Sequence, residues 1–119
     1  MRVSGPGALE IVPRLFRPAA PGPGDPPRFG RFLDREGRPL DHGYVVVFPE
    51  TGSFTGELTV ELWPHASPAV LAELVEAAIG AGAVHAGPGE FTYRALCHGR
   101  LDLARAEAVR DLVEARTLY

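Results

Sequence analysis

The segment Ser53-Phe54-Thr55-Gly56-Glu57 forms an aromatic and acidic loop ahead of a strand that carries a second acid, Glu61. Because side chains alternate along a strand, Glu61 shares a face with Thr59 and Trp63. A carboxylate beside an aromatic ring can accept paired N–H donors from a flat heterocycle while the ring packs on its plane. Glu61 is therefore a candidate ligand-binding residue, and the alternative is a solvent-facing glutamate on an edge strand.

Two later segments also combine charge with tight turns. Gly87-Pro88-Gly89-Glu90-Phe91-Thr92 predicts a turn into a helix, where Glu90 suits the helix N-terminus and Arg94 follows four residues on. His98-Gly99-Arg100-Leu101-Asp102-Leu103 places Arg100 in a joint between helices, from which a guanidinium can reach a ligand carboxylate or carbonyl. The simpler alternatives are a capping acid for Glu90 and a surface residue for Arg100.

Other kinds of site are excluded by the composition. All twelve basic residues are arginine; a P-loop requires a lysine, so we expect no binding of GTP, magnesium or potassium. The four histidines lack metal-ligand spacing, and Cys97 has no second cysteine for a disulfide. A net charge of -3 argues against a free-standing nucleic-acid binder. Without a signal core or an apolar run of membrane length, we expect the cytoplasm and no membrane partner.

The elements that position these residues predict a single α+β domain over residues 1–119, with a mixed β-sheet and flanking helices. A hairpin is expected around a turn at 34–38. The unalternating apolar block Tyr44–Phe48 indicates a strand covered on both faces. The expected strands are the end of one at 1–5, then 28–33, 40–48, 57–63 and a short one at 84–86.

Helices are predicted from apolar periodicity and end signals. Ser67 suits an N-cap and Pro68 the first helical position, and Gly80 ends that helix. Pro13 should kink or shorten the first helix, and the Pro- and Gly-rich residues 17–27 predict a surface connection. The expected helices are 7–16, 68–80, 91–97 and 103–117.

Taken together and in order, these segments resemble the N-terminal domain of the tRNA modification GTPases, the MnmE or TrmE family. The similarity covers essentially the whole chain. Each short motif is weak alone, and their collinear order is what carries the resemblance. The matching pieces are Arg2-Val3-Ser4-Gly5, Ser53-Phe54-Thr55-Gly56-Glu57 with Glu61, Gly89-Glu90-Phe91-Thr92 with Arg94-Ala95, Gly99-Arg100-Leu101-Asp102-Leu103, and Ala106-Glu107-Ala108-Val109 with Ala115-Arg116-Thr117.

The resemblance implies a specific function. Such a domain binds a reduced folate (5-formyl- or 5,10-methylene-tetrahydrofolate), forms a homodimer, and is similar to the folate-binding domain of glycine-cleavage aminomethyltransferases. The full family proteins contain a GTPase and act with a flavoprotein, MnmG (GidA), on C5 of the tRNA wobble uridine at position 34. Expected partners are thus a second copy, an MnmG/GidA-like flavoprotein and a GTPase-bearing chain, with tRNA as the substrate of the assembled system. The expected role is a folate-binding, dimerising module that does not catalyse the modification alone.

The family's folate-binding positions fall on Arg2, Glu61 and Arg100. Glu61 would suit the amino-pyrimidine edge of the pterin, and the two arginines would suit anionic or carbonyl groups. Arg100 replaces the family's lysine, which keeps the charge and changes the donor geometry.

The chain also departs from the family pattern. Members usually begin with a further strand and a Gly/Arg-rich loop ahead of the position of Arg2, and Pro64-His65-Ala66-Ser67 replaces a Cys/Gly-His-Gly-Gly turn. A missing first strand would leave a sheet edge uncovered and favour dimerisation. Two alternatives stay open: a degenerate paralogue with a purely structural or interaction role, and a stand-alone folate-dependent one-carbon transferase.

Overall fold

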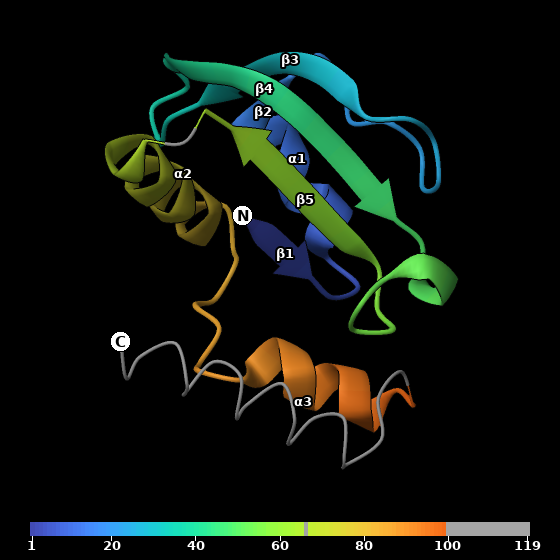
Figure 1. Cartoon of the computed structure of the whole chain (residues 1–119). Coiled ribbons are helices and arrows are strands. Elements are labelled where there is room, and N and C mark those ends of the chain that lie inside the picture. Colours follow the sequence, from blue (N-terminus) through green and yellow to red (C-terminus); the bar gives the residue numbers. More distant parts are fainter. Residues whose placement is uncertain (66, 100–119) are drawn as a thin grey trace, which may run out of the picture.

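A five-stranded sheet organises the part of the chain that this computed structural model describes, residues 1–65 and 67–99 (Figure 1). The strand order is β1-β5-β4-β3-β2, and every pairing among these strands is antiparallel. The predicted α+β class is confirmed, while the expected mixed sheet is corrected to an antiparallel one. From β2 to β5 each strand returns beside the one before it, and β1 joins the edge of β5 in the same antiparallel sense. The strands are β1 (Arg2–Ser4), β2 (Phe16–Arg17), β3 (Arg28–Leu33), β4 (Pro39–Phe48) and β5 (Thr59–Pro64).

The hairpin between β3 and β4 forms where the sequence predicts it. Gly37 has a φ of 80°, which a residue with a side chain rarely adopts. The Asp34 carboxylate accepts the backbone N–H groups of Glu36 and Arg38, each at 2.9 Å. These bonds hold the pKa of Asp34 below its usual value, the bond from Arg38 contributing most. The turn therefore satisfies its own backbone groups.

Helices α1 (Ala8–Leu15) and α2 (Pro68–Gly80) pack against one face of the sheet. Helix α1 ends two residues after Pro13, and Phe16, expected in that helix, begins β2 instead. Helix α2 matches its predicted bounds. The side chain of Ser67, its N-cap residue, makes no capping hydrogen bond. The largest fully buried apolar side chains between helices and sheet are Val12, Leu15, Phe16, Phe32, Val45, Val47, Val60, Leu62 and Leu74.

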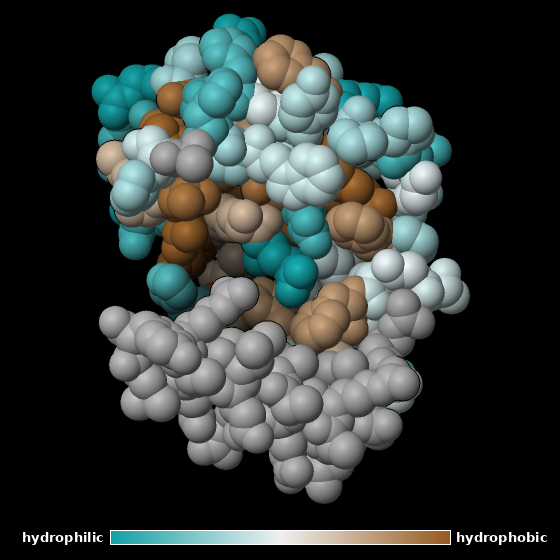
Figure 2. Space-filling view, viewed as in Figure 1, coloured by the Kyte–Doolittle hydropathy of each residue, from teal (hydrophilic) through white to brown (hydrophobic). Residues whose placement is uncertain are grey.

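The opposite face of the sheet is partly open, as Figure 2 shows by hydrophobic residues visible among hydrophilic ones at the surface. Val45, Val46 and Val47 are all buried, as expected of a strand covered on both faces. Tyr44 contradicts that expectation, because its side chain is 46% exposed and its cross-strand partner Trp63 is equally exposed. Within Tyr44–Phe48, burial on both faces is therefore confined to the three valines.

A short 3-10 turn (η1, Glu50–Gly52) and helix α3 (Glu90–Cys97) complete the described elements. The predicted short strand at 84–86 is wrong: these residues form no regular structure and Val84 is 89% exposed. No described strand lies beside this segment to supply ladder hydrogen bonds. The helix expected at 103–117 lies outside the described residues. Among the described helices, none is long and apolar enough to cross a membrane.

Candidate functional site

Arg2 and Glu61 lie directly opposite each other on β1 and β5. Arg2 Nη2 is 3.5 Å from Glu61 Oε2, and the two side chains are 36% and 24% exposed. Both belong to the face of the sheet away from α1 and α2, since their neighbours Val3 and Val60 point into the core. The structure thus brings together two of the three predicted site residues. The third, Arg100, lies outside the described residues.

The Glu61 carboxylate has a second donor. The indole Nε1 of Trp63 lies 3.0 Å from Glu61 Oε1, while Arg2 faces Oε2. An ionised carboxylate offers about four acceptor positions. Glu61 therefore keeps acceptor capacity for a pair of ligand N–H groups with both of its protein donors in place.

The Arg2 guanidinium lies between two aromatic rings. Its Cζ is 5.2 Å from the ring centroid of Phe54 and 5.5 Å from that of Phe91, both within range of a cation–π attraction. Phe54 comes from the loop before β5 and Phe91 from the first turn of α3. The two motifs singled out in the sequence, Ser53–Glu57 and Gly89–Thr92, consequently meet over β1.

Three hydroxyls fix the loop onto the sheet beside this site. Ser4 Oγ lies 2.7 Å from Thr55 Oγ1 and 3.2 Å from Thr59 Oγ1, and the two threonine oxygens are 3.3 Å apart. Thr55 and Thr59 are buried, with 0% and 1% exposure. Ser4 also donates to Glu57 Oε1 at 3.2 Å. Buried polar groups are tolerated only when they are hydrogen-bonded, so this cluster fixes the loop in one conformation.

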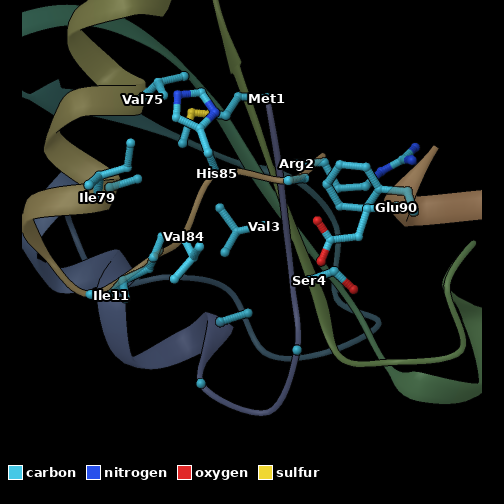
Figure 3. Close-up of a pocket in the computed structure, with 18 of the residues that line it drawn as sticks. Met1, Arg2, Val3, Ser4, Ile11, Val75, Ile79, Val84, His85 and Glu90 are labelled. Carbon is cyan, nitrogen blue, oxygen red and sulfur yellow. The ribbon is translucent and has the colours of Figure 1, made fainter. Parts of the chain in front are cut away.

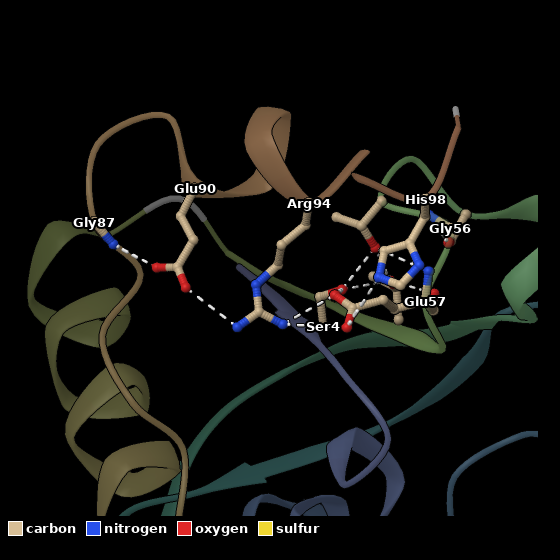
Figure 4. A network of polar contacts seen from close by, with 10 residues as sticks. Ser4, Gly56, Glu57, Gly87, Glu90, Arg94 and His98 are labelled. Atoms are coloured by element: carbon tan, nitrogen blue, oxygen red, sulfur yellow. Dashed lines mark hydrogen bonds and ion pairs between the residues drawn. The ribbon is translucent and has the colours of Figure 1, made fainter. Parts of the chain in front are cut away.

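An ionic network then connects the loop to α3 (Figure 4). Arg94 Nη1 lies 2.9 Å from Glu57 Oε1 and 3.2 Å from Oε2, and its Nη2 lies 3.2 Å from Glu90 Oε1. Glu90 Oε2 accepts the backbone N–H of Gly87 at 2.7 Å. His98 Nε2 is 3.7 Å from Glu57 Oε2. Arg94 and His98 thus link α3 to Glu57, while Glu90 links Arg94 to the turn before the helix.

Contacts within the network shift the pKa values of Glu90 and Arg94. The backbone bond from Gly87, followed by the contact with Arg94, lowers the pKa of Glu90. Hydrogen bonds to Glu57 and then Glu90 raise the pKa of Arg94. Both shifts favour the charged forms of Glu90 and Arg94.

A cavity of about 730 Å³ lies along β1 and is lined by residues of α1 and α2, by residues 82–86 and by the start of α3 (Figure 3). Ile11, Val75 and Ile79 form an apolar wall, and Arg2, Ser4 and Glu90 lie at its polar end. Pockets for small molecules usually measure roughly 300–1,000 Å³ and combine apolar walls with a few polar groups. Glu61 does not line this cavity, and Arg2 is the residue that the cavity shares with the Glu61 site.

Some site residues could not be assigned from the sequence. Glu57 was part of a singled-out loop, but its pairing with Arg94, 37 residues away, left no signal in the spacing. The Glu90–Arg94 contact, by contrast, follows from helical spacing. Among residues 1–65 and 67–99, no group of three or more His, Cys, Asp and Glu side chains is arranged to hold a metal ion.

This fold and site define a small α+β domain with a polar cluster at one sheet edge, and comparison with known proteins places it in a family. The family model described as "GTP-binding protein TrmE N-terminus" matches residues 1–100, and the chain belongs to this family.

Three curated relatives, each named tRNA modification GTPase MnmE, illustrate the similarity. The protein of Halorhodospira halophila is 51% identical over 117 residues, which are 98% of this chain and 24% of that protein. The protein of Myxococcus xanthus is 50% identical over 118 residues, covering 97% of this chain and 26% of that protein. The protein of Thermus thermophilus is 45% identical over 118 residues, covering 97% and 27%. The chain thus spans about a quarter of the length of these relatives.

Proposed function

We propose that this chain binds a reduced folate, 5-formyl- or 5,10-methylene-tetrahydrofolate, and serves the modification of the tRNA wobble uridine at C5. The observation that supports this most directly is the Arg2–Glu61 contact at 3.5 Å, because residues from distant segments form one polar site. The family relationship and the relatives' name, tRNA modification GTPase, support the tRNA part of the proposal.

The donor set suits a folate. Glu61 retains acceptor positions for the paired N–H groups of an amino-pyrimidine edge. Arg2 suits a carbonyl or carboxylate, and Arg100 follows directly on α3 in the sequence, the helix that Arg94 holds beside β1. Because Arg2 also borders the cavity, a ligand at Glu61 would lie next to an apolar wall. When bound, the folate would supply the one-carbon unit, and this chain's residues would bind and orient it.

We further propose that the chain acts as a homodimer, with an MnmG/GidA-like flavoprotein and a GTPase-bearing chain as partners in the assembled system. β1 is an edge strand of the sheet, and among the described residues it pairs only with β5. Such an edge presents backbone groups to a further strand. A strand from a second copy would complete the sheet there.

One alternative has an observation in its favour. Arg2 and Glu61 already face each other, and Arg2 packs on Phe54 and Phe91, so the same contacts can be purely structural. In that case the chain is a degenerate paralogue that serves as an interaction protein without folate. Direct binding measurements separate the two functions.

The test is calorimetry of the purified chain with 5-formyl-tetrahydrofolate. We expect saturable heat from the wild-type chain, none detectable from Glu61→Ala, and wild-type affinity from Glu73→Ala, which removes an exposed glutamate of α2. Absence of heat from a folded wild-type chain favours the degenerate paralogue. Equal binding by Glu61→Ala would keep the ligand and reject the site.

A further inference from the structure

Trp63 is the single tryptophan of the chain, and it lies two residues after Glu61 on β5. Its indole N–H donates to Glu61 Oε1 at 3.0 Å, although its side chain is 46% exposed. Residues two apart on a strand project from the same face, so the contact follows from the strand itself.

The contact restricts the orientation of the carboxylate. Trp63 engages Oε1 and Arg2 faces Oε2, so the two protein donors hold the carboxylate from both sides. A glutamate free to rotate would lose that freedom on binding a ligand, whereas a group held in advance avoids much of the entropic cost. An indole offers one N–H donor and no acceptor. Trp63 can therefore hold one carboxylate oxygen, but it cannot compete with Glu61 for the N–H groups of the ligand.

We propose that Trp63 is a positioning residue of the folate site: its indole N–H orients Glu61 to receive the paired N–H groups of the flat ligand, and its exposed ring flanks that ligand. This inference rests on the proposed function. The proposed role of Trp63 is in ligand affinity and not in packing of the sheet, because Trp63 is 46% exposed.

Tyr44 provides a matched control. It is the cross-strand partner of Trp63, is equally exposed at 46%, and lies on the same face of the sheet. Its ring packs against Phe29, with centroids 5.3 Å apart. Trp63→Phe and Tyr44→Phe each remove one polar hydrogen and keep an aromatic ring, so a general effect on the sheet would appear in both.

The first measurement needs no ligand. Because the chain has one tryptophan, a nitrogen-15 correlation spectrum of the 119-residue chain contains a single indole N–H signal. We expect Glu61→Ala to move that signal upfield, as loss of a hydrogen bond does, and Tyr44→Phe to leave it close to its wild-type position. An indole signal indifferent to Glu61→Ala would overturn the contact on which the inference depends.

The second measurement is calorimetry with 5-formyl-tetrahydrofolate. A hydrogen bond to a charged group leads us to expect affinity lowered by about 5- to 30-fold in Trp63→Phe. Tyr44→Phe should stay within about twofold, and Trp63→His, which keeps an aromatic ring and regains an N–H donor, should recover part of the loss.

The outcomes separate the inference from the function it rests on. Wild-type affinity in Trp63→Phe, with the wild-type chain binding folate, overturns the role of Trp63 alone. No heat from the wild-type chain, with the indole signal still sensitive to Glu61→Ala, overturns the proposed folate function and the role of Trp63 with it. Thermal unfolding of each variant shows whether the fold is retained.

Discussion

Arg94 on α3 forms an ion pair with both carboxylate oxygens of Glu57, which lies in the loop before β5. One guanidinium nitrogen, Nη1, lies 2.9 Å from Oε1 and 3.2 Å from Oε2 of the carboxylate, whose side chain is 15% exposed. In the described part of the chain, α3 has no contact with the sheet as extensive as those of α1 or α2. The position of α3 therefore depends on this polar contact.

Removing Glu57 should loosen α3. Glu57→Ala leaves Arg94 without its principal partner and Ser4 without one acceptor, and the expected loss of unfolding free energy is about 1–3 kcal/mol. Urea unfolding gives the magnitude, and hydrogen exchange shows whether the amides of residues 90–97 lose protection first. Glu50→Ala changes an exposed glutamate of the same connection and should be neutral. Equal protection of α3 in both variants would contradict the assignment.

Asp41 should make stability depend on acid pH. Its carboxylate accepts the His65 ring Nδ1 at 3.0 Å and the backbone N–H groups of His42 and His65 at 2.8 Å each. These bonds, the side-chain bond from His65 first, lower the pKa of Asp41 in the folded state. Its contribution is therefore present above the unfolded pKa of about 3.9 and is lost as the pH falls through the lower folded pKa.

Thermal unfolding between pH 2.5 and pH 7 tests this contribution. Asp41→Asn should lower the melting temperature at pH 7 and reduce its fall below about pH 4. Asp25→Asn, at an exposed aspartate of the 17–27 connection, should reproduce the wild-type curve. A wild-type slope in Asp41→Asn would show that other carboxylates govern the acid limb.

Gly43 is required by the close approach of β4 and β5. A Cβ added there would collide with the backbone carbonyl oxygen of Trp63 and lie 2.8 Å from Cε2 of Phe32. The backbone obstacle cannot rotate away, so Gly43→Ala should lower the unfolding free energy by roughly 1–3 kcal/mol. At Gly7 an added Cβ meets nothing within 4 Å, and Gly7→Ala should change stability by less than about 1 kcal/mol. Comparable melting temperatures for the two variants would refute this reading.

The sequence predicts elements whose signals are local. The β3–β4 hairpin follows from two apolar runs around a turn closed by Asp34 and Gly37, and α2 follows from Pro68 and a final glycine. The strand predicted at 84–86 is wrong because so short a segment forms a strand only where a neighbouring strand is available to pair with it. The exposure of Tyr44 could not be predicted either, because an apolar run does not indicate how much of each strand face is covered.

In the candidate site, too, the sequence indicates some residues and contacts and not others. Glu61 was indicated by strand alternation and its aromatic neighbour, and Arg2 by the family resemblance alone. Neither signal shows that the two residues are cross-strand partners. The link from Trp63 to Glu61 was implicit in strand alternation, which places both on one face. The Glu57–Arg94 pair joins segments 37 residues apart, and a single sequence carries no signal for such a long-range contact.

If the chain is a stable homodimer, its sedimentation coefficient should be that of a two-chain species and should not change with concentration in the micromolar range. The backbone nitrogens of Met1 and Gly5 donate to carbonyl oxygens on the β5 side, so the alternating N–H of Ser4 faces the outer edge of β1. If that edge forms the interface, Ser4→Pro should weaken association, because proline removes a ladder donor there. Ser4→Ala, which removes the hydroxyl and keeps the backbone N–H, and Glu10→Ala, at an exposed position of α1, serve as controls. A stable monomer at high micromolar concentration would argue decisively against the dimer.

The final prediction distinguishes the two ends of a folate. Glu61 would contact the pterin, where loss of a desolvated charge-assisted partner costs about 2–5 kcal/mol, or roughly 30-fold and upward in affinity. Arg100→Ala should weaken 5-formyl-tetrahydrofolate binding less, because a contact with a carboxylate tail in water is screened by solvent and salt. Calorimetry at about 50 and 500 mM salt should therefore show the wild-type and Arg100→Ala affinities converging at high salt, with Glu61→Ala undetectable at both. If instead Arg100→Ala abolishes binding at either salt concentration, the arginine engages a desolvated part of the ligand, and the proposed orientation of the folate is reversed.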